Sequence, residues 1–536
     1  MPCDREIEQF LTHHLEVIEP LNRETALAWW DAALTGSDEH LNRSAELSAR
    51  LWKIYADPQD YQRILRMSED PPTDPLLARQ LKLLLHAYQG SQFPPDVIDR
   101  IVNIEKEIEA EYDNFRAPLR GEPVSDNHLA DILRSSNDGE LRKDAWEASK
   151  LIAPRVVDRI QELIRLRNRE AQRLGFTDFY SMSLHLSELD EEGLFAVLQD
   201  LYRQTEPLWK RYKSELDDQL AARFGTTSDH IYPWHYSDPF FQEAPPDDLA
   251  LDQLFSSADL VELAGRFYTE IGLPVDDILA RSDLYERPGK SQHAFCTDID
   301  RNGDIRILCN LRPDARWMTT LLHELGHAVY DKYNDLQLPY LLREPAHTLF
   351  TEAIAELMGR LSTNRNWLER YLGLDEQQAI SIGRTTDRAL GSHLLVFTRW
   401  CLVMIHFERE MYRQPDQDLN RLWWDLVEKY QEIRKPEGRS APDWAAKIHL
   451  AQVPVYYQNY LLGEMVASQL HQFIVSKITA DEGEKAFASS PKVGHTLQER
   501  VFKLGATHPW DETLKLATGE PLMVEYFVTQ MGVEVG

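Results

Sequence analysis

The chain has 536 residues, of which 43% are hydrophobic and 27% charged, a composition typical of a folded globular protein. Its 88 acidic residues outnumber the 58 Lys and Arg, and the formal charge of -30 argues against binding to nucleic acid or to an anionic membrane. The N-terminal segment lacks the apolar core of a signal peptide, and no apolar stretch reaches the roughly 20 residues of a membrane span. We therefore expect a cytoplasmic protein without nucleic-acid or membrane partners; its oligomeric state is not indicated.

Most of the chain shows the apolar spacing of three and four residues that is typical of helices, with clear examples at 97–112, 141–175 and 259–272. No internal repeat and no low-complexity linker divides the chain. We therefore expect a mainly α protein that forms a single domain of two lobes over residues 1–536. The N-terminal helices, to about residue 125, are expected to form a lid or part of one lobe.

One β-hairpin is predicted within residues 293–310, where Asn302-Gly303 is a strong turn signal. Folding the segment at that dipeptide would place Cys296 opposite Cys309, where a disulfide could form, although two reduced thiols are the favoured interpretation. The chain has no CxxC pair, and its four cysteines are too few for a disulfide framework. They are Cys3, Cys296, Cys309 and Cys401.

The helix that follows, 314–334, contains the sequence HELGH. His323 and His327 are four residues apart, so both imidazoles project from one face of the helix and can bind one zinc ion. Glu324 lies about 100° around the helix from His323, where it can act as a general base without being a ligand. The pattern indicates a metal-dependent hydrolase.

A catalytic zinc ion needs a third protein ligand and one open position. In one pattern a third His follows six residues after the second, but that position is Tyr333. In the other pattern a second helix supplies a Glu, and residues 346–362 are predicted to form such a helix after a loop. We assign Glu352 to the metal and Glu356 to a hydrogen bond with a His N–H; Glu344, in the loop, is the weaker candidate ligand.

At this point the chain resembles the angiotensin-converting-enzyme family of zinc peptidyl-dipeptidases, over about residues 130–530. The thimet-oligopeptidase family is a relative with the same fold. Four segments in the family's order carry the resemblance: HELGHAVYDKYNDLQLPYLLREPAHTLFTEAIAEL, RLWWDLVEKYQ, KIHLAQVPVYYQNY and FKLGATHPWDETLKLATGEP. The resemblance implies a two-lobed helical metallopeptidase with a deep central channel that admits short peptides. It also implies one zinc ion per chain.

Residue by residue, the resemblance implies that His323, His327 and Glu352 bind zinc and that Glu324 is the base. It further implies that His449 and Tyr460 donate hydrogen bonds to the oxyanion, although the stretch between them is shifted by one residue. Lys447 and Tyr457 match groups that hold a substrate's C-terminal carboxylate. His293 and Ala294 match a pair in a strand, here 292–297, that aligns the bound peptide.

Some positions depart from the family pattern. Two arginines of the family are replaced by Asn459 and Val427, so the chloride sites are in doubt and we expect little response to chloride. A Gln that binds the substrate carboxylate has no clear match, and Tyr236 is the nearest candidate. We therefore expect hydrolysis of short peptides with release of C-terminal dipeptides. An endo-acting oligopeptidase and a non-catalytic zinc- or peptide-binding protein are the alternatives.

Overall fold

The computed structural model describes residues 4–245 and 251–532, so Cys3 lies outside the described residues. The described residues form two compact units, each built from separate stretches of the chain. Unit 1 comprises those within Met1–Gln92, Leu249–Thr386 and Leu462–Phe527, and unit 2 those within Phe93–Asp248, Asp387–Leu461 and Val528–Gly536. The expectation of a mainly α protein with a small hairpin is confirmed.

The elements of unit 1 are α1 (Asp4–Thr35), α2 (Asp38–Tyr55), α3 (Pro58–Ser68), α4 (Pro75–Gly90), α11 (Leu251–Phe255), α12 (Leu260–Glu270), α13 (Asp276–Arg281), β3 (Phe295–Asp298), β4 (Ile305–Leu308), α14 (Ala315–Lys332), η3 (Tyr340–Leu342), α15 (Thr348–Gly359), η4 (Arg360–Thr363), α16 (Arg365–Leu372), η6 (Ile474–Ile478), η7 (Glu484–Ala488), α21 (Pro491–Arg500), η8 (Phe502–Leu504) and α22 (Trp510–Thr518).

Those of unit 2 are α5 (Pro95–Asn114), β1 (Ala117–Leu119), β2 (Glu122–Val124), α6 (Asp126–Ser135), α7 (Gly139–Ser149), α8 (Ala153–Arg173), α9 (Phe179–Leu186), α10 (Glu191–Phe224), η1 (Ser228–His230), η2 (Pro233–His235), α18 (Leu419–Gln431), η5 (Asp443–Ala446) and α19 (His449–Gln452). Three helices have residues in both units: α17 (Glu376–Arg413), α20 (Tyr457–Phe473) and α23 (Val524–Met531).

Among the described helices, α17 alone is long and apolar enough to cross a membrane by length and composition. The most apolar window of this helix has a mean hydropathy of 1.4, and 72% of the window is buried inside the protein. A core helix of a folded protein has these same properties, because its apolar residues face other parts of the chain.

The helix predicted over 141–175 is two helices, α7 and α8, separated at residues 150–152. Pro154 stands in the first turn of α8, where its missing N–H needs no partner, so the proline starts a new helix and does not continue the old one. The helices predicted at 97–112 and 259–272 correspond to α5 and α12.

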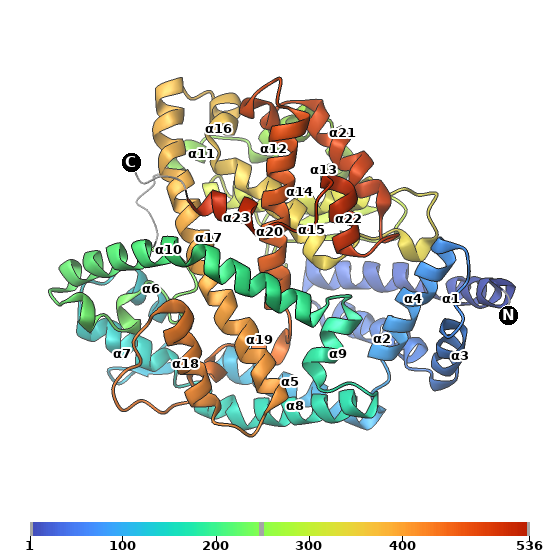
Figure 1. The fold of residues 1–536 in the computed structure, drawn as a ribbon, viewed down its shortest axis with the longest axis horizontal. Helices are drawn as coiled ribbons and strands as arrows, with labels where there is room; N and C mark the ends of the chain where they lie inside the picture. Colours follow the sequence, from blue (N-terminus) through green and yellow to red (C-terminus); the bar gives the residue numbers. More distant parts are fainter. Residues whose placement is uncertain (1–3, 246–250, 533–536) are drawn as a thin grey trace. The chain divides into compact units, whose positions relative to one another are not determined.

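The two helices that carry HELGH and Glu352, α14 and α15, pack side by side in unit 1 (Figure 1). Asp314 caps α14 by accepting the backbone N–H of Trp317, and His347 caps α15 by accepting that of Leu349. The two helices approach very closely at Gly326, where an added Cβ would lie 2.7 Å from Ala355 Cα. The glycine of HELGH is therefore what allows side chains from both helices to converge.

The hairpin forms, but its register differs from the prediction. Cys296 pairs with Ile307, not with Cys309, because the turn is centred one residue earlier than Asn302-Gly303. The side chain of Asp298 accepts the backbone N–H groups of Asp300 and Arg301, and the Asp300 side chain accepts those of Asn302 and Asp304. These local bonds shift the centre of the loop by one residue, which shifts each cross-strand partner by two. The described cysteines are free thiols.

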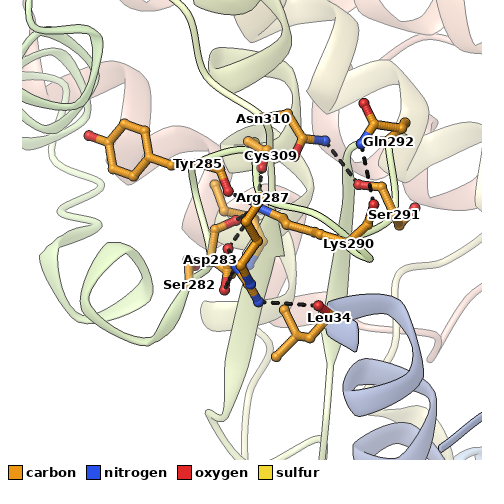
Figure 2. Close-up of polar contacts among 11 residues, drawn as sticks. Leu34, Ser282, Asp283, Tyr285, Arg287, Lys290, Ser291, Gln292, Cys309 and Asn310 are labelled. Carbon is orange, nitrogen blue, oxygen red and sulfur yellow. Dashed lines mark hydrogen bonds and ion pairs between the residues drawn. The ribbon is translucent and has the colours of Figure 1, made fainter. Parts of the chain in front are cut away.

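The loop that leads into β3 is fixed by a buried lysine (Figure 2). Lys290 Nζ donates to the carbonyl oxygens of Asp283, Tyr285 and Cys309 at 3.1, 2.8 and 2.5 Å, and it lies 2.7 Å from Asp283 Oδ1. Arg287 adds a bond to the Leu34 carbonyl at the end of α1. The ammonium group thus ties this loop to Cys309, the residue that follows β4.

We predict that Gly326→Ala lowers the free energy of unfolding. Overpacking against a helix backbone costs about 1–3 kcal/mol, more than the ~1 kcal/mol that alanine gains over glycine inside a helix. Gly265→Ala in α12 is the matched control, because its Cβ would meet only Leu279 Cδ1 at 3.9 Å. Urea unfolding of both variants measures the difference. Equal stability of the two variants would contradict the close approach of α14 and α15.

Candidate metal centre

Three candidate ligand atoms from α14 and α15 come together in unit 1. Within the described part of the chain, His323, His327 and Glu352 form a group whose ligand atoms all lie within 4.8 Å of one another. The Nε2 atoms of His323 and His327 lie 3.8 and 3.9 Å from Glu352 Oε2. Ligands of a tetrahedral zinc ion stand about 3.3 Å apart, so small rotations of these side chains would close the set around a metal. The donor set fits a catalytic zinc ion.

The outer nitrogens of the two imidazoles also have partners. His327 Nδ1 lies 2.7 Å from Thr351 Oγ1, and His323 Nδ1 lies 3.5 Å from Glu356 Oε1. These contacts leave both Nε2 atoms directed to the shared position, as in proteins where the far nitrogen of a metal-binding His is held by an acceptor. Glu356 is where the sequence predicted it, whereas Thr351 was not predicted. Its only signal is a hydroxyl next to Glu352 in the sequence.

The side chains at this centre are poorly solvated. Burial, with a smaller effect of His323, lowers the pKa of His327 to about 3, so its imidazole is neutral and can bind a metal. Burial also raises the pKa of Glu352. Glu324 is only 7% exposed, and burial raises the pKa of its carboxyl to about 7. A bound cation would act against these shifts on both carboxyl groups.

Glu344 is not part of the group of ligand atoms. Its carboxylate forms an ion pair with Arg301 in the hairpin loop, and its side chain is 49% exposed. This arrangement agrees with its rank as the weaker candidate.

The strand predicted over 292–297 is shorter and begins later. β3 starts at Phe295, so His293 and Ala294 lie just before it, in the segment that follows the Lys290 loop. The pairing of the hairpin ends at Phe295, whose partner is Leu308, the last residue of β4. His293 is exposed.

The remaining predicted site residues belong to unit 2. His449 begins α19, and Tyr457 and Tyr460 lie in the first turn of α20. The rings of His449 and Tyr457 are 5.4 Å apart, and those of Tyr457 and Tyr460 are 5.8 Å apart. His449 Nδ1 is buried without a hydrogen-bond partner among the described residues, and burial lowers its pKa to about 4. The imidazole of His449 is therefore neutral near pH 7.

The structure identifies a glutamine that the sequence argument missed. Lys447 Nζ donates to Gln242 Oε1 at 2.7 Å, and the ammonium lies 6.0 Å from the centre of the Tyr457 ring. Tyr236 is not a suitable replacement for the carboxylate-binding Gln of the family. Its side chain is buried at 1% exposure, and its hydroxyl donates to Asp217. The signal for Gln242 is its place six residues after Tyr236 in the same proline- and aromatic-rich stretch.

The two positions that lack arginine are both buried, with Val427 at 4% and Asn459 at 5% exposure. Val427 lines a small cavity together with Lys150 and Asp443. Lys150 Nζ donates to the Pro239 carbonyl at 2.9 Å, and Asp443 is held by both arms of Arg439 at 2.6 Å. The lining of this cavity thus includes the Asp443 carboxylate as well as the Lys150 ammonium.

We predict that Thr351→Val weakens zinc binding about 10–100-fold, because it removes the acceptor that orients His327 while keeping the side chain's volume. Thr351→Ser is the control, since it keeps the hydroxyl. Competition with a chromophoric chelator measures the affinity of the metal-free protein. An unchanged zinc affinity in Thr351→Val would mean that the hydroxyl does not orient the imidazole.

Comparison with known proteins places these residues in a family. The family model Peptidase_M2, angiotensin-converting enzyme, matches residues 2–233 and 238–530. The chain is 24% identical over 490 residues, 84% of its length, to the angiotensin-converting enzyme-like protein Ace3 of Mus musculus, and spans 65% of that protein. It is 26% identical to the angiotensin-converting enzyme of Rattus norvegicus over 75% of its own length and 33% of that protein's. It is 23% identical to the angiotensin-converting enzyme of Haematobia irritans exigua over 96% of its own length and 90% of that protein's. The chain belongs to the Peptidase_M2, angiotensin-converting enzyme, family.

Proposed function

We propose that the protein is a zinc metallopeptidase that releases dipeptides from the C-termini of short peptides. The observation that carries the proposal is the convergence of His323, His327 and Glu352 beside the buried Glu324. A metal-binding role alone would not require a carboxylate at position 324, since a base is dispensable for binding. Membership of the Peptidase_M2 family supports an enzyme and a peptide substrate.

In this proposal His323, His327 and Glu352 would hold one zinc ion, which supplies a Lewis acid that polarises the scissile carbonyl and acidifies water. Glu324 takes the proton of the attacking water and passes it to the leaving amine. His449 and Tyr460 donate hydrogen bonds to the developing oxyanion. Each bond stabilises the transition state by about 3 kcal/mol. Backbone groups at His293 and Ala294 align the peptide.

The C-terminal preference rests on a second cluster in unit 2. Lys447, Gln242 and Tyr457 offer an ammonium, an amide and a phenol, a donor set that suits a carboxylate. Burial lowers the pKa of Lys447 to about 8, and an incoming carboxylate would favour its charged form. If the C-terminal carboxylate is held at a fixed place, the bond that is cut lies at a fixed distance from the chain end. Two extended residues span roughly 7 Å, so this distance would select the release of dipeptides.

We also propose that chloride has little effect on activity. Neither Val427 nor Asn459 provides a cation, and Asp443 already supplies negative charge in the cavity beside Lys150. Arg439 already neutralises that carboxylate, and burial lowers the pKa of Lys150 to about 7, so the cavity holds little positive charge for an added anion.

We predict that Glu324→Gln keeps zinc but loses most of its turnover, by about 100–10,000-fold, because general-base catalysis needs the carboxylate and ligation does not. Metal analysis and turnover of a short peptide are measured on the same preparation. Glu344→Gln is the control for changing a nearby carboxylate, because Glu344 is not part of the group of ligand atoms and is 49% exposed. A zinc-loaded Glu324→Gln protein with normal turnover would remove Glu324 from the mechanism.

We predict that amidating the C-terminus of a peptide strongly lowers kcat/KM, because the amide removes the charge that Lys447 meets. Lys447→Ala should reproduce that loss on the free acid and have little effect on the amide, since the two changes remove opposite ends of one interaction. Mass spectrometry of the products gives both rate and cleavage position. Equal cleavage of both peptides at internal bonds would rule out dipeptide release.

A further inference from the structure

The turn between His449 and Tyr457 contains a residue in a strained conformation. Val455 has φ of 55°, in the left-handed region, which is unfavourable for a β-branched side chain. Such a residue costs on the order of 1–3 kcal/mol and persists only where its surroundings hold it. It lies in the stretch that is shifted by one residue relative to the family pattern, between the two residues proposed to stabilise the oxyanion. Something in unit 2 must therefore hold this turn.

A buried carboxyl group contacts the strained residue directly. Glu408, on α17 and only 1% exposed, accepts the backbone N–H of Val455 through Oε1 at 2.9 Å. On the other side of Val455, Gln458 Nε2 donates to its carbonyl oxygen at 2.6 Å. Burial raises the pKa of Glu408 to about 8, so the carboxyl is mostly neutral at pH 7 and resembles a glutamine amide.

A guanidinium group holds the other end of the same turn. Arg167, on α8, donates to the Ala451 carbonyl oxygen at 2.7 Å and lies 3.5 Å from that of Leu450. These carbonyls belong to α19, the short helix that begins at His449. Arg167 is itself held by Tyr412 Oη at 3.2 Å and by Glu105 at 2.7 Å. All of these groups lie within unit 2.

Glu408 and Arg167 therefore hold residues 450–455 at both ends through hydrogen bonds to the backbone. The rings of His449 and Tyr457, which flank the turn, are 5.4 Å apart, so a change in the turn changes their spacing. A hydrogen bond to a buried N–H is costly to leave unmade, about 1–3 kcal/mol, which is comparable with the strain at Val455. Losing the acceptor would thus remove what keeps the turn in its strained form.

We propose that Glu408 is a positioning residue, which with Arg167 holds the turn 450–455 in its strained form and so sets His449, a proposed oxyanion donor, against the first turn of α20, which carries Tyr457 and Tyr460. The proposal rests on the proposed peptidase function. Glu408 touches neither substrate nor metal ligand in this account; it acts only through the backbone of Val455. Its effect on the reaction is then a matter of acceptor geometry, not of charge.

The test compares Glu408→Gln, which keeps an acceptor oxygen, with Glu408→Leu, which has similar volume and none. Displacing an oxyanion donor by about 1 Å can cost on the order of 100-fold in rate. We expect Glu408→Leu to lower kcat at least about 10-fold, with a smaller change in KM and unchanged zinc content, and Glu408→Gln to remain within about 3-fold of the native protein. Equal turnover of the two variants would overturn the proposal.

A second variant tests the same point through the backbone. Glycine adopts the left-handed conformation without strain, so Val455→Gly should hold the turn without help from Glu408. We expect Val455→Gly and Val455→Gly/Glu408→Leu to differ by less than about 3-fold in kcat. This comparison also stands if Glu408→Leu alone does not fold. A further loss of about 10-fold in the double variant would overturn the proposal.

Two readouts separate this proposal from the proposed function. Amide hydrogen exchange in 453–457 should be faster in Glu408→Leu than in Glu408→Gln, whatever the protein's activity. In a His449→Ala background, Glu408→Leu should add little further loss of kcat. Full activity of His449→Ala would refute the oxyanion role alone, whereas unchanged exchange in Glu408→Leu would refute the turn's dependence on Glu408.

Discussion

The close approach of α14 and α15 is the constraint on which the candidate metal centre depends. The three candidate ligand atoms come from two helices, and they can meet only because Gly326 has no side chain to hold the helices apart. Gly359 plays a similar part at the other end, where an added Cβ would lie 3.4 Å from His323 Cβ. The helix contact places the candidate ligands on rigid elements. The outer imidazole nitrogens of His327 and His323 then contact Thr351 and Glu356.

Burial then determines what each polar group can do. At the metal centre it keeps His327 neutral and raises the pKa of the Glu324 carboxyl. In unit 2 it lowers the pKa of Lys447, the proposed partner of a substrate carboxylate, and raises that of Glu408, the proposed positioning residue. The same physical effect, poor solvation, thus underlies the proposed metal binding, substrate recognition and positioning of the turn.

Local patterns in the sequence predicted much of this arrangement. The spacing of His323 and His327, and a glutamate on the following helix, could be found because helix periodicity fixes which residues share a face. The hairpin register could not, because it depends on which N–H groups Asp298 and Asp300 accept. Thr351, Gln242 and Glu408 could not be predicted for a related reason. Their contacts with His327, Lys447 and Val455 form only in the folded chain.

The most direct test of the account is to digest a defined decapeptide with the purified protein, with and without a zinc chelator, and to identify the products by mass spectrometry. The account predicts successive loss of C-terminal dipeptides, abolished by the chelator and restored by added zinc. Cleavage that continues unchanged in the metal-free protein would contradict the central claim, that the group formed by His323, His327 and Glu352 holds a catalytic metal.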